Sequence, residues 1–230
     1  MPLVRQTENR QSKPIKFAGH NMQLDARGVL YWPAESCLIV SDLHLEKGSF
    51  LRQFAHPVPG YDTKDSLARL GACINDYQPK QLVCLGDSFH DRHGVQRLKQ
   101  HDVVQIHALV QQVKHWVWVL GNHDPALPGS LPGEQVPFLT REGICLTHEP
   151  MDTIEPQVIG HFHPKFRRRV GGQKLSGRCF LYHQHRLMMP AFGAYTGGLS
   201  VNDPAIGEVM GPEFRCMLMM QDKLWPVSVK

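Results

Sequence analysis

Five short, wholly apolar runs along the chain each end abruptly in a cluster of polar residues. The runs and their clusters are CLIV-SDLH (37–44), QLVCL-GDSFHD (81–91), WVWVL-GNHD (116–124), ICL-THEP (144–150) and VI-GHFH (158–163). Apolar runs without alternation suit strands that are buried on both faces, as in a parallel or mixed sheet covered by helices. This pattern limits the possible folds more than any other feature of the sequence.

Two segments between the early runs have the apolar periodicity of helices. The first follows Asp62 or Thr63, either of which can cap it, and the second spans residues 97–114. After His163 the helical signal disappears, and the rest of the chain reads as strands separated by Gly and Pro turns. We therefore expect an α/β fold, a sandwich of two packed, mostly mixed β-sheets flanked by helices.

The length of 230 residues suits one large domain or two small ones. Residues 1–20 are polar and predict an N-terminal arm, with residues 21–230 forming a single domain. The N-terminus lacks the apolar core of a secretory signal, and no apolar stretch is long enough to span a bilayer. The six cysteines are scattered without a CxxC pair, which favours a reduced, cytoplasmic protein.

The charge of the chain is unevenly distributed. Between Glu155 and Asp203 there are seven basic residues and no acidic one: Lys165, Arg167, Arg168, Arg169, Lys174, Arg178 and Arg186. The net charge of the whole chain is +4, so the rest of the chain is net −3. One basic block on an otherwise slightly acidic protein favours a polyanionic partner, although a solvated surface would also account for it.

Each polar cluster follows the end of an expected strand, and the carboxyl ends of strands in an open α/β sheet form one rim where ligands bind. Side chains from all five clusters could therefore meet at one site. Seven of them are good ligands for divalent cations: Asp42, His44, Asp87, Asn122, His148, His161 and His163. Any one of these histidines alone would more often be a packed or surface residue, but five clusters in this order are hard to explain in that way.

This set of donors suits the hydrolysis of a phosphate ester by two metal ions. Two cations about 3.5–4 Å apart neutralise the ester oxygens and create a hydroxide at neutral pH. One bridging carboxylate and three further ligands for each metal account for the seven residues, and His123 is left for another task. The mixture of nitrogen and oxygen donors favours Mn²⁺, with Fe or Zn as alternatives, over Mg²⁺ or Ca²⁺.

The series D-x-H, G-D, G-N-H-D, H and G-H-x-H, which runs from Ser41 to His163, resembles the motifs of the calcineurin-like metallophosphoesterase superfamily. The stretches SDLHLEKGSFLRQFAHPVPGYDTKDSLARL, GDSFHD, GHFHP and LMMPAFGAYTGG are similar to the bacterial ligase-associated metallophosphoesterases, a family of DNA damage response endonucleases. This similarity covers nearly the whole chain after the arm. It implies a metal-dependent phosphoesterase in DNA repair, with an ATP-dependent DNA ligase and an exonuclease or helicase as partners.

The resemblance also implies a role for each site residue. Asp42, His44 and His163 would hold one metal, Asn122, His148 and His161 the second, and Asp87 would bridge them. His123 would act on the substrate, as general acid or as a stabiliser of transition-state charge. Many members carry GDxxDR, whereas GDSFHDR here has one extra residue, so His90 and Asp91 compete to support His123. We expect Asp91 in that role, because a carboxylate orients an imidazole better than a second imidazole does.

Five cations are expected to contact the DNA backbone. They are Arg52, soon after the first motif, and Lys165, Arg167, Arg168 and Arg169, directly after the last one. An ordinary surface position is an equally good interpretation of Arg52. The substrate would be single-stranded, nicked or 3′-blocked DNA, and the activity that of a phosphodiesterase, an endonuclease or a 3′-phosphatase.

Two other functions are compatible with the same motifs. One is hydrolysis of a small phosphodiester or pyrophosphate of nucleotide type, which needs the metals but no extended basic surface. The other is a non-catalytic adaptor that docks a DNA ligase or exonuclease. Such adaptors often lose metal ligands, whereas none of the expected ligands is missing here.

Overall fold

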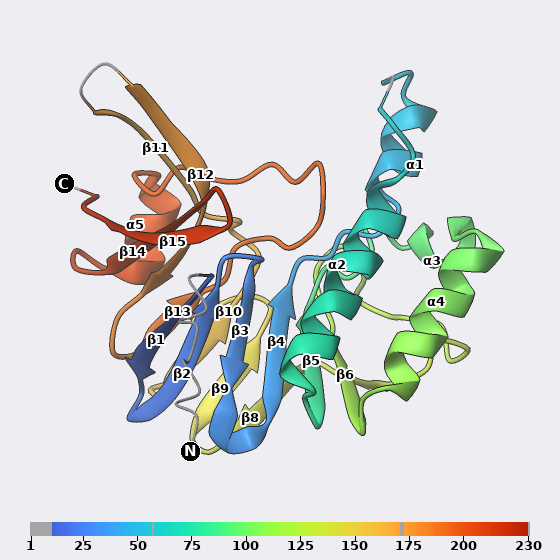
Figure 1. Cartoon of the computed structure of the whole chain (residues 1–230), viewed down its shortest axis with the longest axis horizontal. Coiled ribbons are helices and arrows are strands. Elements are labelled where there is room, and N and C mark those ends of the chain that lie inside the picture. The colour runs from blue at the N-terminus through green and yellow to red at the C-terminus, as the bar shows by residue number, and fades with distance from the viewer. Residues whose placement is uncertain (1–10, 57, 171–172, 230) are drawn as a thin grey trace, which may run out of the picture.

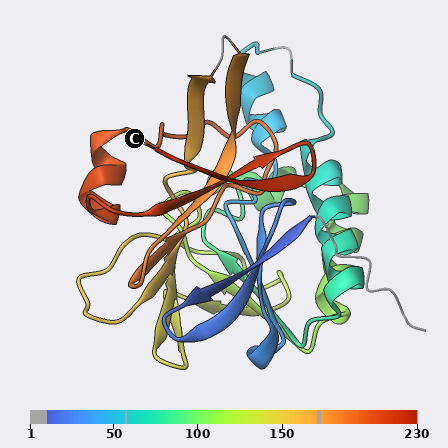
Figure 2. The same cartoon turned by 60° about the vertical axis from the view of Figure 1, so that its left-hand side comes forward.

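A computed structural model describes residues 11–56, 58–170 and 173–229. Two β-sheets pack face to face, helices α2 and α4 cover the outer face of the first sheet, and α5 covers the outer face of the second (Figures 1 and 2). The expected sandwich of two mixed sheets flanked by helices is confirmed. Within these described ranges, no helix combines the length and the apolar character needed to cross a membrane.

The first sheet contains seven strands, and their order in the sheet follows the sequence. They are β1 (Ser12–Phe17), β2 (His20–Asp25), β3 (Val29–Trp32), β4 (Cys37–Ser41), β5 (Gln81–Leu85), β6 (His115–Val119) and β7 (Glu134–Val136). The pairs from β1 to β4 are antiparallel, and those from β4 to β7 are parallel. The carboxyl ends of β4, β5 and β6 therefore share one edge of the sheet.

The second sheet has the order β15-β14-β12-β13-β10-β9-β8, and β11 pairs with β12 off this path. Its strands are β8 (Phe138–Arg141), β9 (Ile144–Thr147), β10 (Gln157–Ile159), β11 (Lys165–Val170), β12 (Gln173–Tyr182), β13 (Arg186–Met188), β14 (Arg215–Met220) and β15 (Lys223–Val227). β9, β10 and β13 run parallel to one another. Their carboxyl ends also share an edge, so each sheet presents one such edge.

The helices and the buried clusters account for the apolar runs. The helical elements are η1 (Pro33–Glu35), α1 (Lys47–Gln53), α2 (Asp62–Tyr77), α3 (Gly94–Arg97), α4 (Gln100–Gln111) and α5 (Pro204–Met210). One apolar cluster fills the space between the two sheets, and a second lies between the first sheet and helices α2 and α4. β4 and β5 contribute to both clusters, so every residue of these two strands is buried. This explains why their sequences do not alternate.

Residues 12–20 differ from the expected N-terminal arm. β1 pairs with β2 along its whole length, and Ile15 and Phe17 pack in the core between the sheets. Two apolar side chains at alternate positions are enough to bury one face of an edge strand, even in a polar segment. The arm interpretation is therefore wrong for this part of the chain, and residues 1–10 lie outside the described residues.

The helical expectations also need correction. The helix expected over 97–114 is α4, which is shorter and spans Gln100–Gln111, and the separate short helix α3 ends at Arg97 before it begins. α5 was not expected, although the Asp203 side chain accepts a hydrogen bond from the Ala205 N–H (3.0 Å) and caps it.

Neither Asp62 nor Thr63 caps α2. Asp62 instead accepts a hydrogen bond from the Gly48 N–H (2.7 Å), and Thr63 accepts one from the Glu46 N–H (2.9 Å). These two bonds attach the start of α1 to α2. The polar side chains at the start of α2 therefore hold the segment that follows the first polar cluster.

Candidate metal centre

Five of the seven expected ligands stand in the left-handed region of backbone space. The φ angles are 54° at Asp42, 43° at His44, 46° at Asp87, 69° at His161 and 48° at His163. This conformation costs a non-glycine residue roughly 1–2 kcal/mol, and such residues cluster where function requires them. Each lies just past the end of a buried strand, where the turn directs its side chain toward the shared edge of the sheets.

Two glycines allow the segments from the two sheets to approach one another. A Cβ on Gly86 would lie 2.3 Å from the Cγ of His148, and one on Gly160 would lie 2.0 Å from the Ser41 Oγ. Gly86 also has a φ of +67°, which other residues adopt only at a cost. The glycines of the G-D and G-H-x-H motifs thus serve the contact between strands β5 and β9 and between β4 and β10.

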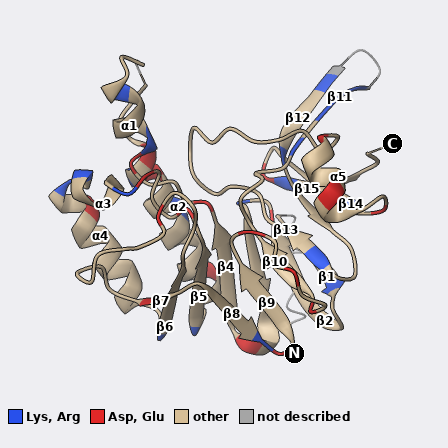
Figure 3. Ribbon diagram, turned by 180° about the vertical axis from the view of Figure 1, so that it is seen from behind, with Lys and Arg blue, Asp and Glu red and all other residues tan. Residues whose placement is uncertain are grey.

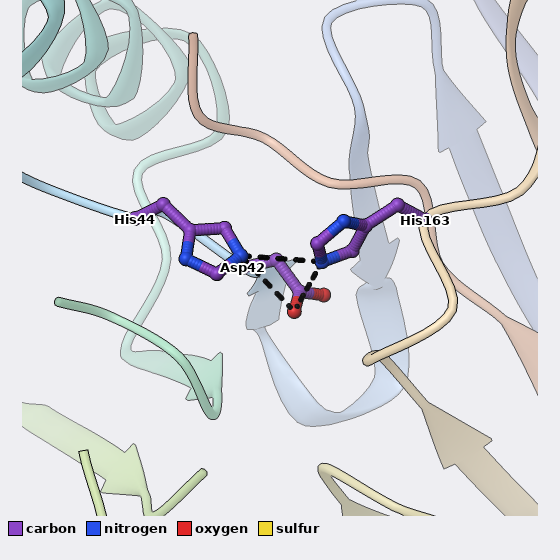
Figure 4. Close-up of side chains that lie close together, drawn as sticks. All are labelled: Asp42, His44 and His163. Carbon is purple, nitrogen blue, oxygen red and sulfur yellow. Dashed lines mark hydrogen bonds and ion pairs between the residues drawn. The ribbon is translucent and has the colours of Figure 1, made fainter. Parts of the chain in front are cut away.

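Asp42, His44 and His163 form the first group of donors. The His163 Nε2 lies 2.9 Å from the Asp42 Oδ1 and 3.2 Å from the His44 Nε2, and the three side chains point toward a common centre (Figure 4). The His44 Nε2 lies 4.0 Å from the same Asp42 oxygen. Asp42 and His44 come from the segment after β4, whereas His163 follows β10, so this group joins the two sheets.

Asn122, His148 and His161 form the second group. The Asn122 Oδ1 lies 3.0 Å from the His148 Nε2 and 3.1 Å from the His161 Nδ1, and these two nitrogens are 3.2 Å apart. The His148 Nδ1 lies 3.0 Å from the Leu85 carbonyl oxygen and donates to it. That bond leaves the His148 Nε2 without a proton when the ring is neutral, so this nitrogen can bind a metal.

Asp87 lies between the two groups. Its Oδ2 is 3.3 Å from the His148 Nε2 of the second group and 4.0 Å from the His44 Nε2 of the first. The Asp87 Oδ1 accepts a hydrogen bond from the His123 N–H (2.9 Å), which fixes the carboxylate in this orientation. The position is the one that a bridging ligand requires.

Burial and mutual charge set the protonation of the site. Burial by itself would raise the pKa of Asp87. The hydrogen bond and the charge of His148 outweigh this effect and lower the pKa to about 2. Burial lowers the pKa of His148, yet Asp87 and Asp42 outweigh this effect and raise it to about 9. Burial lowers the pKa of His44 to about 3 against the pull of the same carboxylates. Two buried carboxylates thus remain ionised and favour a bound cation.

The donor atoms fit two divalent cations. Metal–nitrogen and metal–oxygen bonds are about 2.0–2.2 Å long, so neighbouring ligand atoms on one metal lie roughly 3.0–3.5 Å apart. The closest contacts within each group fall in or close to this range, from 2.9 Å to 3.2 Å. In each of two groups of carboxylates and imidazoles, the ligand atoms lie within 4.8 Å of one another. These groups are Asp42–His44–His163 and Asp87–His148–His161. The structure therefore brings all seven expected ligands together, in the two groups that the resemblance implies.

Residues outside the two groups hold the donors in place. The Glu149 Oε1 lies 3.6 Å from the His161 Nε2, the ring nitrogen that faces away from the second group. The Ser41 hydroxyl donates to the Asp42 Oδ2. Asp124 accepts backbone N–H groups of Asp87 (3.1 Å), Phe89 (3.0 Å) and Gly121 (3.0 Å), and so ties the β5 and β6 segments together. Sequence analysis did not single out Glu149 because one glutamate after a histidine carries no distinguishing pattern.

The structure brings His90, and not Asp91, to His123. The His123 and His90 rings stack with centroids 5.2 Å apart and planes 22° apart. Asp91 instead forms an ion pair with Arg97 and accepts the His93 N–H (2.7 Å). The extra residue in GDSFHDR turns the carboxylate away from the site, so the expectation for Asp91 is wrong. His123 itself is partly exposed, and its Nε2 lies 3.9 Å from the Asp87 Oδ2.

The expected DNA-contacting cations are not equivalent. Arg52 lies on the exposed side of α1, and its closest polar contact is the Val58 carbonyl oxygen at 3.5 Å. The other four lie on β11, which begins two residues after His163.

Sequence analysis missed Lys47. Burial has the largest effect on this half-buried residue and lowers the pKa of its ammonium group. The charge of Lys165 lowers this pKa as well, whereas the charges of Asp87 and Asp42 raise it.

Three comparisons with known proteins bear on this site. The family model for calcineurin-like phosphoesterases matches residues 36–187, which is more than half of the chain and includes every expected ligand. No curated protein is similar enough to the sequence to count as a match. The fold resembles the crystal structure of nuclease MPE from Pseudomonas putida with a TM-score of 0.75. The two chains are 28% identical over 94% of this chain and 100% of that one.

A more distant match is Yfce, a phosphoesterase from E. coli. It is 15% identical, and the alignment covers 84% of this chain and 99% of that chain with a TM-score of 0.40. This likeness is too weak to support a conclusion about the present chain. The family match and the likeness to the nuclease are therefore the two findings that bear on function.

Proposed function

Because the chain belongs to the calcineurin-like phosphoesterase family and is a metal-dependent phosphoester hydrolase, we propose that it is a binuclear phosphodiesterase that cleaves DNA. One observation carries the choice of DNA. The basic block begins at Lys165, two residues after His163, and this nearness of cations to the expected ligands supports a polyanionic substrate. The similar fold of a nuclease supports the same substrate class.

The seven donors would hold two divalent cations, with Asp87 between them. Bound at this site, the ions would lower the pKa of a water molecule and neutralise the oxygens of the ester. Mn²⁺ suits the mixed nitrogen and oxygen donors, with Fe or Zn as alternatives. The sequence resemblance adds a role in DNA repair beside an ATP-dependent DNA ligase, and the scattered cysteines favour the cytoplasm.

His123 would act on the substrate from the edge of the metal centre. Its backbone N–H is bonded to the Asp87 Oδ1, and its ring is held by stacking on His90. The side chain is 40% exposed, so its Nε2 is accessible to a bound substrate. We assign it the protonation of the leaving oxygen, or the stabilisation of charge on that oxygen. His90 replaces the carboxylate that was expected to position this imidazole.

The test is a set of metal-reconstituted assays on two kinds of substrate. The purified chain, loaded with Mn²⁺, Fe²⁺, Zn²⁺ or Mg²⁺, would be supplied with bis-p-nitrophenyl phosphate and with single-stranded, nicked, gapped and 3′-phosphate DNA. We expect cleavage of both kinds of substrate, with the highest rate for Mn²⁺. Cleavage of the small diester without any DNA product would reject the DNA assignment and favour a small nucleotide-type substrate. No activity with any metal would favour a non-catalytic adaptor.

A further inference from the structure

Six of the seven cations of the basic block lie on a two-stranded ribbon, formed by β11 and the first part of β12, whose far end projects beyond the second sheet (Figure 1). Side chains of a strand alternate between its two faces, and residues paired directly across a ribbon share a face. Lys165, Arg167 and Arg169 therefore lie on one face of the ribbon. Their partners across the ribbon, Arg178, Ser176 and Lys174, lie on the same face. Blue segments on both strands in Figure 3 mark these cations.

The opposite face of the ribbon faces the body of the protein. Phe166 is 3% exposed and packs in an apolar cluster that includes Ile206 and Met210 of α5, and Leu175 packs against the same cluster. Arg168 shares this face, and its guanidinium donates to the Ser228 carbonyl oxygen (3.3 Å). Arg168 is also exposed, but it lies on the inner face and is held by this hydrogen bond, whereas its two neighbours lie on the outer face.

The cations at the base of the outer face are already engaged. The Lys165 Nζ donates to the Thr196 carbonyl oxygen (2.8 Å), and Arg178 donates to those of Ala191 (2.7 Å) and Phe192 (3.1 Å). These acceptors belong to one loop, residues 190–199, which we call the strap. Two backbone N–H groups of the strap also donate hydrogen bonds: Phe192 to the Ser41 carbonyl oxygen (2.8 Å) and Gly193 to the Asp42 carbonyl oxygen (3.0 Å). The base of the ribbon is therefore fastened to the metal centre.

The three outer cations, Arg167, Arg169 and Lys174, are exposed. In the described part of the chain, their side chains have no hydrogen bond or ion pair. Arg169 stands directly across from Lys174, and like charges directly opposite one another destabilise a strand pair. No acidic residue between Glu155 and Asp203 relieves this repulsion locally. The repulsion would be relieved when the ribbon binds a polyanion.

We infer that this outer face binds the phosphates of DNA on one side of the bond that is cut, an inference that rests on the proposed function. Four residues along a strand span about 13 Å, so Arg169 reaches about 13 Å beyond Lys165 at the base. This distance corresponds to about four nucleotides at 3.4 Å each along a duplex strand. The enzyme would therefore need several nucleotides on one side of the scissile bond for full activity, and the contacts would not depend on their sequence.

The experiment compares a ribbon variant, R167Q/R169Q/K174Q, with a control variant, K16Q/K80Q/K114Q. The control also removes three exposed positive charges, but at the opposite end of the first sheet, where Lys80 and Lys114 precede β5 and β6. Both variants and the wild type, loaded with metal, would be assayed on bis-p-nitrophenyl phosphate, on a dinucleotide and on long oligonucleotides across a salt series. Circular dichroism and metal analysis would check that each variant is folded and loaded.

We expect the ribbon variant to match the wild type on both small substrates. On long DNA, its kcat/KM should fall on the order of 10- to 100-fold near 0.1 M salt, and the slope of log kcat/KM against log salt should flatten by about 2, as for three lost contacts to a single strand. Shortening the DNA on one side of the cut should reduce the wild-type rate to that of the variant. The control variant should keep the wild-type values, and R167Q should be impaired more than R168Q.

Three results would overturn the inference. The first is a ribbon variant with the wild-type salt slope on long DNA, and the second is an equal loss in the control variant, which would mean that only net charge matters. In both cases the wild type still cleaves DNA, so the proposed function would stand. The third result is a wild type that cleaves the small diester and no DNA, which would remove the proposed function and this inference together.

Discussion

Replacing Gly86 by alanine tests the close contact between the two sheets at the metal centre. The new methyl carbon would stand 2.3 Å from the Cγ and 2.4 Å from the Nδ1 of His148, at a residue whose φ is +67°. The His148 ring cannot easily retreat, because its Nδ1 is bonded to the Leu85 carbonyl oxygen. The substitution should therefore strain the backbone and displace a metal ligand at the same time.

The magnitude follows from two contributions. A left-handed conformation costs an alanine roughly 1–2 kcal/mol, and forcing an extra methyl group into a packed site costs roughly 1–3 kcal/mol. We expect a loss of unfolding free energy of about 2–5 kcal/mol, at about 2–4 °C of melting temperature for each kcal/mol in a protein of this size. Metal content should also fall, since His148 can no longer keep its place in the second group.

Gly143 provides a matched control. Its φ is +73°, but a Cβ there would have no atom within 4 Å. Gly143→Ala should therefore lose only the backbone contribution, about 1–2 kcal/mol, and keep both metals. Thermal unfolding followed by circular dichroism and elemental analysis of the metal-loaded proteins would measure both quantities. If the two variants melt at the same temperature and hold the same amount of metal, the contact between Gly86 and His148 does not constrain the site.

Three further outcomes follow from the site. Asp87→Asn should abolish activity and lower metal content, because an amide cannot serve two cations as a carboxylate does, and elemental analysis with full occupancy would contradict the bridge. His123→Ala should retain metal but slow cleavage of DNA on the order of 100-fold, with a smaller loss on a nitrophenyl ester, whose leaving group hardly needs a proton; equal losses on both substrates would favour charge stabilisation instead. In the metal-free protein, Asp87 and Asp42 keep His148 protonated up to a pKa of about 9, and a metal needs the neutral ring. Metal affinity, measured by competition with a chelator, should therefore rise about tenfold per pH unit up to about pH 9, and a flat profile would show that no proton is displaced.

Local sequence predicts much of this protein because its strongest signals are short. The apolar runs 37–40 and 82–85 predict strands that are buried on both faces, and β4 and β5 are such strands. The polar residues that follow them lie at the carboxyl ends of strands in any parallel arrangement. The residues proposed as metal ligands could therefore be named before any contact between strands was known.

The same local reasoning fails where pairing over long distances decides the outcome. The polar segment around Ile15 and Phe17 becomes a strand only because β2 is beside it and a core lies beneath it. The choice between His90 and Asp91 depends on where Arg97 lies, since Arg97 forms an ion pair with that carboxylate. No periodicity in GDSFHDR reports the position of either partner.

The sequence by itself determined the strands that are buried on both faces, the types of side chain that follow them and the presence of a basic block, because each is a property of a few neighbouring residues. The tertiary structure decided how His163 of one sheet meets Asp42 of the other. It also decided on which face of the ribbon each arginine lies, because the face of Arg168 depends on the packing of Phe166 beneath the ribbon. These outcomes depend on contacts between residues far apart in the chain, and such contacts form only when the two sheets pack together.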